Sequence, residues 1–259
     1  MIQVFVGCSA NNEDLESQVV FKYQLERLAS APVNITWMRL SRDPSSPFYS
    51  ADNAGWVTNA WATPFSAFRW AIPSVMGYTG RAIYFDSDFI PMADVKELAD
   101  LALHPGRVMV AKGGNRYCCT LWDCAAAVGH VPHYSVLMRD PNSHARMNAY
   151  FGRNNQFVQT FSPLADWNVM DLVLPVDLTQ SKIKAIHYTQ LHKQLHYKYA
   201  IPRLQAEGVK HWYQGGRQAH DRTDLQALFD RCYEEAVAAG ITPESLRVEP
   251  FGAYRIRGK

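Results

Sequence analysis

The chain has 259 residues, of which 47% are hydrophobic and 19% are charged, so it has enough apolar material for a sizeable core and does not resemble a disordered protein. The formal net charge is only +2, which argues against a dedicated nucleic-acid-binding protein, because such proteins concentrate basic residues on one face. No run approaches 18 consecutive apolar residues, which excludes a membrane-spanning helix but leaves peripheral membrane contact open.

The five cysteines are odd in number and do not follow a paired zinc-binding spacing. Cys118 and Cys119 are adjacent, so in a strand their side chains would point to opposite faces. We interpret the cysteines as reduced thiols and expect a cytoplasmic protein. The N-terminus has no basic region and turns acidic early, which favours a first strand over a signal peptide.

The first 40 residues predict a β-α-β unit. Residues 2–8 are typical of a buried strand, residues 13–29 carry apolar side chains at helical spacing, and residues 33–40 are β-branched and suit a second strand. Because parallel strands need a crossover helix, this opening predicts an α/β sheet. Residues 41–62 are rich in Ser, Pro, Asn and aromatic residues and predict a long loop of the kind that often carries function.

The middle of the chain predicts a helix, a strand and a second helix. Residues 64–76 look helical, with Arg69 in their middle and Pro73 ending or kinking them. A strand follows at 81–86, and 93–103 reads as a short amphipathic helix.

The remaining segments are shorter or mixed. We predict strands at 107–113, 117–128, 172–176 and 184–188, a mixed polar stretch at 140–156, a basic and aromatic segment at 192–203, and a helix at 221–240. The predicted organisation is one α/β domain over 1–215, with a C-terminal helical extension over 216–259 packed on the same domain.

Two carboxylates emerge where the predicted strand at 81–86 ends. Asp86, Ser87 and Asp88 follow directly on three apolar residues, and ligands collect at the carboxyl ends of strands in open α/β sheets. An arbitrary Asp-x-Asp triplet is more often structural, as is a lone histidine at a strand end. Asp86, Asp88 and His187 at the ends of neighbouring strands would nevertheless form a mixed site for Mn²⁺ or Mg²⁺.

Several stretches together resemble a known enzyme family. The segments IQVFVGC, the Arg69 helix, RAIYFDSDFIPMADVKEL, ADWNVMD and IHYTQLHKQ occur in this order over roughly residues 1–200, as in family 8-type glycosyltransferases. The resemblance implies a GT-A type nucleotide-sugar-binding fold, with a mixed central sheet flanked by helices. It also implies a metal-dependent hexosyltransferase that moves a sugar from a UDP-sugar to a hydroxyl of a carbohydrate or lipid-linked saccharide, with retention at the anomeric carbon.

The resemblance also assigns roles on the donor side. It makes Asp86, Asp88 and His187 the ligands of Mn²⁺ or Mg²⁺, and places Asp86 and Ser87 beside the donor. Arg69 matches an arginine near the pyrophosphate, or else is a surface or ion-pair arginine. His187 begins the family pattern His-x-x-Gly-x-x-Lys, in which Gln190 here replaces the glycine and Lys193 falls in the lysine place; Lys198 is a second candidate for that lysine.

Two further sites are implied less directly. Gly7, Cys8 and Ser9 match the turn where uridine and ribose would lie, although this turn lacks the aspartate common in the family. Many family members have Asp-Gln-Asp-x-x-Asn near the sugar, whereas Ala165 occupies a carboxylate position here. Asp166 and Asn168 are then the candidate catalytic residues; Asp166 would contact the acceptor or sugar, or else cap a loop.

Four tryptophans and one basic segment each allow two interpretations. Trp56, Trp61, Trp122 and Trp167 would offer flat faces to sugar rings, or belong to the core. The segment 192–203 would line the phosphate site or face an anionic lipid-linked acceptor, or form a solvated helix face.

Two other functions fit parts of the sequence. A strand followed by Asp-x-Asp also occurs in haloacid-dehalogenase-type phosphatases, whose first aspartate is a nucleophile. That motif normally lies on the first strand, whereas a β-α-β unit precedes it here. The third reading is a UDP-sugar-binding protein without turnover, which the alanine at position 165 permits.

Overall fold

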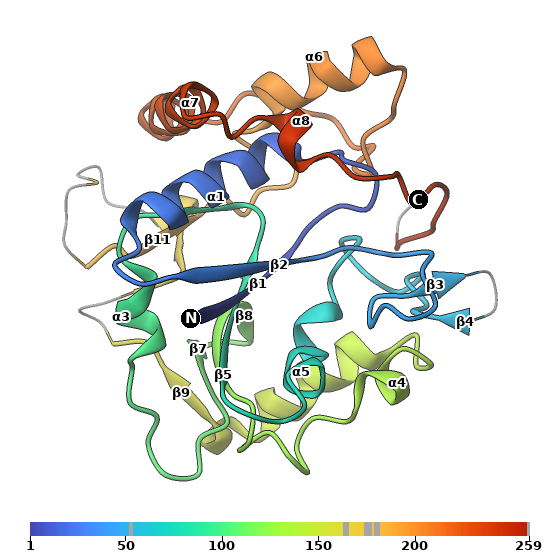
Figure 1. Cartoon of the computed structure of the whole chain (residues 1–259), viewed down its shortest axis with the longest axis vertical. Coiled ribbons are helices and arrows are strands. Elements are labelled where there is room, and N and C mark those ends of the chain that lie inside the picture. Colours follow the sequence, from blue (N-terminus) through green and yellow to red (C-terminus); the bar gives the residue numbers. More distant parts are fainter. Residues whose placement is uncertain (52–53, 163–165, 174–177, 179–181, 258–259) are drawn as a thin grey trace.

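The computed structural model describes residues 1–51, 54–162, 166–173, 178 and 182–257, and a six-stranded sheet lies at its centre (Figure 1). The strand order is β2-β1-β5-β8-β7-β9. The strands are β1 (Ile2–Gly7), β2 (Val33–Met38), β5 (Arg81–Asp86), β7 (Met109–Lys112), β8 (Arg116–Asp123) and β9 (Val158–Thr160). β8 is antiparallel to both neighbours, while the other adjacent pairs are parallel. The predicted mixed α/β sheet is therefore confirmed.

The predicted β-α-β opening is also present. β1 and β2 run parallel and are joined by α1 (Leu15–Leu28). β1 lies between β2 and β5, and packed apolar layers cover both faces of the sheet at this strand. A strand in this position needs apolar side chains on both faces, which explains the unbroken run of apolar residues in its second half.

Alternation along β1 divides its side chains between two apolar layers. Val4 and Val6 pack toward α1 and α3 (Val95–Ala99), in a cluster that also holds Phe21 and Phe85. Phe5 lies on the opposite face. That face is covered by η1 (Phe68–Trp70), α2 (Ile72–Val75) and α5 (Ser143–Arg153), with α4 (Tyr134–Leu137) and η2 (Asn155–Phe157) nearby.

A smaller three-stranded sheet lies beyond the end of β5. It contains β10 (Val169–Met170), β11 (Ala185–His187) and β6 (Phe89–Pro91), in that order. β6 follows β5 after a two-residue break and pairs antiparallel with β11. This pairing brings two segments about a hundred residues apart to the same edge.

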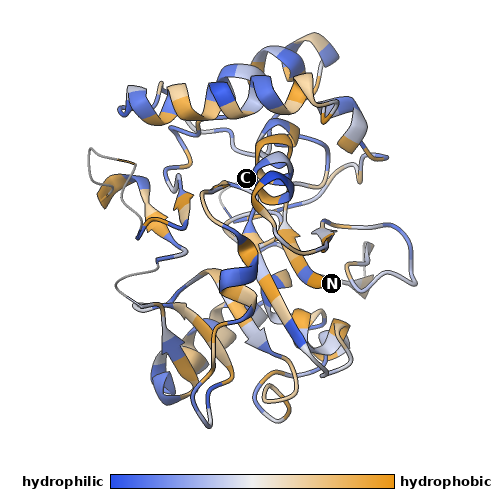
Figure 2. Cartoon of the chain, turned by 60° about the vertical axis from the view of Figure 1, so that its left-hand side comes forward, coloured by the Kyte–Doolittle hydropathy of each residue, from blue (hydrophilic) through white to orange (hydrophobic). Residues whose placement is uncertain are grey.

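The C-terminal helices form a layer over α1 (Figure 1). They are α6 (Tyr197–Glu207), α7 (Thr223–Ala238) and α8 (Pro243–Leu246), and α7 packs on α1. Figure 2 shows hydrophilic and hydrophobic residues alternating along α6 and α7, as expected for helices with one buried face. The helix predicted at 221–240 is confirmed, while the domain boundary at residue 215 stays a prediction. Within the described ranges no helix is long and apolar enough to span a bilayer.

Some predicted elements differ from the structure. The helix predicted at 64–76 is confirmed only in part, because two short helices, η1 and the four-residue α2, lie within that range. Pro73 lies in the first turn of α2, so it begins that helix and does not end one. The loop at 41–62 contains a small hairpin, β3 (Ser50–Ala51) and β4 (Ala54–Gly55). The strand predicted at 172–176 is wrong over its first two residues, which belong to the 3₁₀ turn η3 (Asp171–Val173); residues 174–176 lie outside the described part.

Candidate functional site

The candidate site lies where β5 and β11 end side by side. Asp86 is the last residue of β5, and His187 is the last residue of β11. His187 pairs with Phe89 across the β11–β6 ladder, one residue after Asp88, and the Tyr188 amide donates to the Asp88 carbonyl over 3.2 Å. The sheet topology thus brings together the two aspartates and the histidine that the sequence predicted.

Three ligand-type side chains converge at this point. One atom each from Asp86, Cys118 and His187 lie within 4.8 Å of one another. The Asp88 Oδ1 atom lies 3.3 Å from His187 Nε2 and is buried without a hydrogen-bond partner. A buried carboxylate oxygen without a partner is costly unless a ligand completes it. This donor set of carboxylate, imidazole and thiol groups fits a divalent transition-metal ion.

The His187 ring is held in one orientation. It stacks on Phe89, with 4.2 Å between ring centroids and 14° between planes. Its Nδ1 atom lies 3.1 Å from Asn168 Oδ1. Because an amide oxygen only accepts, this contact places a proton on Nδ1, while Nε2 faces the Asp88 carboxylate. Asn168, predicted as catalytic, therefore lies in the site as a residue that orients His187.

Arg69 provides the positive charge beside Asp86. Its guanidinium donates from Nη2 to Asp86 Oδ1 over 2.9 Å and from Nη1 to Cys118 Sγ over 3.6 Å, and it lies over the Tyr84 ring. The Tyr84 hydroxyl also donates to Asp86. Burial raises the pKa of Asp86, and the neighbouring Arg69 charge opposes that rise. Arg69 thus forms an ion pair with Asp86, which is the alternative considered from the sequence, and its place near the pyrophosphate stays a prediction.

The turn after β1 is packed tightly and carries an unpredicted aspartate. Cys8 and Ser9 are fully buried, and a Cβ atom at Gly7 would approach the Tyr84 hydroxyl to 2.6 Å, so a glycine is needed there. Asp14 accepts from the Ser9 amide and hydroxyl, and from the Ser87 hydroxyl over 2.9 Å. Asp14 thereby links the turn after β1 to Ser87. The roles of the turn toward uridine and ribose stay predictions.

Asp166 lies at one side of the site. Its carboxylate forms an ion pair with Lys112. It also accepts a hydrogen bond from the backbone N–H of Asn168 over 2.8 Å, which is the loop-capping contact considered from the sequence. Because Asn168 in turn contacts His187, Asp166 is linked to His187 through Asn168. Ala165 lies outside the described residues.

The two candidate phosphate-binding lysines are engaged with aspartates. Lys193 pairs with Asp221 at 2.6 Å, and Lys198 on α6 pairs with Asp230 on α7 at 2.7 Å. Lys193 is the less exposed of the two side chains. Within the described residues, the ion-pair partners of these ammonium groups are Asp221 and Asp230, not Asp86 or Asp88.

The four tryptophans considered as sugar platforms belong to the core. Each is at most 2% exposed, so none offers a face to a ligand: Trp56, Trp61, Trp122 and Trp167. The sequence reading also missed Cys118 and Asp14 as parts of the site. The available signal for Cys118 was its place in the strand predicted at 117–128, but the sequence gives neither the neighbours of that strand nor its register.

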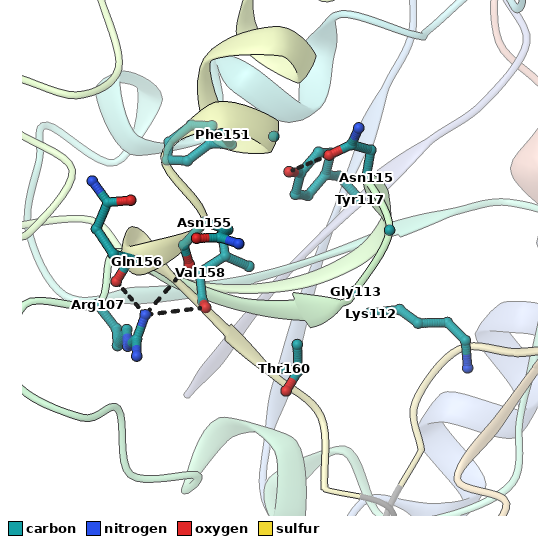
Figure 3. Close-up of a pocket in the computed structure, with 12 residues that line it drawn as sticks. Arg107, Lys112, Gly113, Asn115, Tyr117, Phe151, Asn155, Gln156, Val158 and Thr160 are labelled. Atoms are coloured by element: carbon teal, nitrogen blue, oxygen red, sulfur yellow. Dashed lines mark hydrogen bonds between the residues drawn. The ribbon is translucent and has the colours of Figure 1, made fainter.

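A groove of about 610 Å³ runs beside the site (Figure 3). It lies between α5, β7 and β9 and has walls of mixed polarity, in which the polar side chains are those of Arg107, Lys112, Asn115, Tyr117, Asn155, Gln156 and Thr160. Lys112 extends from the end of β7, on the side of the groove away from Arg107, and reaches Asp166. The Lys112 and Asp166 ion pair therefore connects the groove to the Asn168 and His187 contact.

Solved structures of glycosyltransferases share this architecture. The galactosyltransferase LgtC, solved with donor and acceptor sugar analogues, matches with a TM-score of 0.56 at 8% identity, over 90% of this chain and 96% of LgtC. Apo GlyE from Streptococcus pneumoniae matches with a TM-score of 0.53 at 11% identity, over 93% of this chain and 64% of GlyE. The chain has the GT-A glycosyltransferase fold. The likeness at these identities concerns the fold alone.

Sequence comparisons add one relative. No family model matches the chain. Protein CDI of Arabidopsis thaliana is 33% identical over 99 residues, which are 38% of this chain and 36% of that protein. The aligned part thus spans about a third of that relative, and the comparison covers too little of either protein to show a family.

Proposed function

We propose that the protein is a metal-dependent glycosyltransferase of the family 8 type that transfers a hexose from a UDP-sugar to an acceptor hydroxyl, with retention. The observation that supports this most is the convergence of Asp86, Asp88 and His187 at adjoining strand ends within a GT-A fold. The Asp86 and Asp88 carboxylates and the His187 imidazole would hold the cation, Mn²⁺ or Mg²⁺.

In this proposal the protein's own groups prepare the donor side. A bound divalent cation would neutralise charge on the departing UDP. Asn168 keeps the proton on His187 Nδ1, so that Nε2 is free to bind. Arg69 opposes the rise in the pKa of Asp86 that burial causes, and in this proposal its guanidinium would also bind the diphosphate oxygens.

Lys193 is the better lysine for the diphosphate. Its partner Asp221 is 67% exposed, and an ion pair with so exposed a partner adds little free energy. A doubly charged diphosphate can therefore displace Asp221 at low cost. Lys198 pairs across to α7, where the contact also joins two helices, and we assign it a secondary role at most.

The groove beside β7 is our candidate for the acceptor site. Its polar side chains suit the hydroxyls of a saccharide, free or lipid-linked, and its Lys112 end leads to Asp166. We propose that Asp166 and Asn168 lie between acceptor and donor. The five cysteines are free, in keeping with a cytoplasmic location, and a lipid-linked acceptor would involve contact with the membrane surface.

Two other functions are less well supported. A haloacid-dehalogenase-type phosphatase would place its aspartate nucleophile on the first strand, whereas Asp86 ends β5, beyond the β1-α1-β2 unit. A UDP-sugar-binding protein without turnover has the same fold and donor site, so only an assay separates it from an enzyme.

A donor screen tests the proposal. We expect purified protein with Mn²⁺ to release UDP from one or more of UDP-glucose, UDP-galactose and their N-acetyl forms, and the release should stop when EDTA removes the cation. UDP binding without release from any of these donors would support the binding protein, and phosphate release from simple monoesters would support the phosphatase.

A further inference from the structure

We propose that Cys118 is itself a ligand of the cation, which makes the site selective for thiophilic ions such as Zn²⁺ or Co²⁺ over Mg²⁺. This inference rests on the metal site of the proposed function and specifies its chemistry. Thiolate ligands favour Zn²⁺ and other borderline ions, whereas Mg²⁺ prefers oxygen ligands and retains its water.

The strand register places Cys118 at the cluster. In the antiparallel β5–β8 ladder Phe85 pairs with Cys119, so Cys118 lies beside Asp86 and its side chain points to the same face as the Asp86 carboxylate. The ligand atoms of Asp86, Cys118 and His187 are all within 4.8 Å of one another. Ligands on one tetrahedral zinc ion are about 3.4–3.8 Å apart, so side-chain movements of about 1 Å would close the site.

The charges around Cys118 suit a metal thiolate. Arg69 donates to Asp86 from one nitrogen and to Cys118 Sγ from another, so the guanidinium bridges the two groups. A thiolate at Cys118 and the carboxylates of Asp86 and Asp88 together carry three negative charges. A divalent cation together with Arg69 balances these three negative charges. Without the thiolate the same cation would leave the buried cluster positive.

The neighbouring cysteine provides a matched control. Cys119 points to the opposite face, where it is fully buried in an apolar cluster with Val110 and Leu121. It offers the same chemical group one residue away, but no access to the cation. A change at Cys119 therefore reports what the loss of one buried thiol does to the fold alone.

Absorption spectroscopy with Co²⁺ tests the proposal. On titrating the full chain with Co²⁺, we expect a sulfur-to-cobalt charge-transfer band in the near ultraviolet for the wild type and for Cys119→Ala. Cys118→Ser should lack the band and bind Co²⁺ at least about tenfold more weakly. Its affinity for Mg²⁺ should stay within about twofold of the wild-type value, because oxygen ligands still serve that ion. Circular dichroism of the apo variants checks that each is folded.

The outcomes separate this inference from the proposed function. A folded wild type that binds Co²⁺ without the band, or that does not bind it, overturns Cys118 ligation, as does a band that persists in Cys118→Ser. If the protein releases UDP from a donor but shows no cobalt charge-transfer band, the transferase function is supported and Cys118 ligation is rejected. A band without UDP release from any donor would keep the thiolate site and reject the transferase.

Discussion

Asn168 is the residue that links the loop before β10 to the metal-type cluster. It is fully buried, its Oδ1 atom fixes His187, and its amide is held by Asp166. An orienting residue of this kind acts through the ligand it holds, because the ligand loses its fixed tautomer and direction without it.

We predict that Asn168→Ala weakens Mn²⁺-dependent UDP binding by about 10- to 100-fold, which is typical for loss of a group that orients a metal ligand. Calorimetric titration of UDP in the presence of Mn²⁺ measures this. Asn168→Asp, which keeps an acceptor oxygen near His187 Nδ1, should retain most of the affinity. Equal losses for both variants would contradict an orienting role.

His196 is a buried histidine whose pKa is lower in the folded protein than in the unfolded chain. It is 4% exposed, lies among the rings of Tyr188, Tyr197 and His211, and neither of its ring nitrogens has a hydrogen-bond partner among the described residues. Burial lowers its pKa from 6.5 to about 4, because the charged ring would lose its hydration.

The pH dependence of stability follows from this shift. The unfolded chain takes up a proton on His196 below pH 6.5, while the folded protein resists it until about pH 4, so the free energy of unfolding falls as the pH falls through that window. We predict that wild type loses about 1.4 kcal/mol per pH unit more than His196→Phe between these values. Urea unfolding at a series of pH values measures the difference. Equal slopes of the free energy of unfolding against pH for wild type and His196→Phe would contradict the prediction.

At the scale of elements, the groove is formed where α5 packs across β7 and β9. Thr160 is exposed at the end of β9 and lines the groove, so a larger side chain there would fill space without disturbing the core. An indole at this position would occupy the volume that we assign to the acceptor.

We predict that Thr160→Trp reduces sugar transfer to a saccharide acceptor by at least about tenfold, as expected when a bulky group blocks a binding site. UDP release in the absence of acceptor should be unchanged, because the donor side is not touched. Rates of transfer and of donor hydrolysis, measured side by side, distinguish the two effects. Gln205→Trp, at an exposed position on α6, is the control. If Thr160→Trp transfers sugar as fast as the wild type, the acceptor does not bind in this groove.

Elements with a clear local pattern were predictable from the sequence. The apolar runs at 2–8 and 81–86 and the amphipathic helix at 221–240 form as expected, because their residues satisfy the period of one type of element. The segment at 64–76 did not, because its apolar residues are buried on all sides against the sheet and Pro73 suits the first turn of a new helix. Burial by the tertiary structure outweighed the local pattern there.

At the scale of the whole molecule, the site depends on contacts between distant segments. Asp86, Asp88 and His187 were predictable because each lies at, or within two residues of, the end of an apolar strand. Cys118 was not, since its place at the cluster depends on the β5–β8 register, which the sequence does not display. Asp14 was missed for a similar reason: a turn folds its carboxylate back onto Ser9 and Ser87.

The metal-assisted donor site is the central proposal for the molecule as a whole, and calorimetric titration of UDP tests it most directly. We predict that wild type binds UDP at least about tenfold more tightly with Mn²⁺ than with EDTA, and that the double variant Asp86→Ala, Asp88→Ala loses this difference while remaining folded. Equal UDP affinity of wild type and double variant in Mn²⁺ would contradict the metal site.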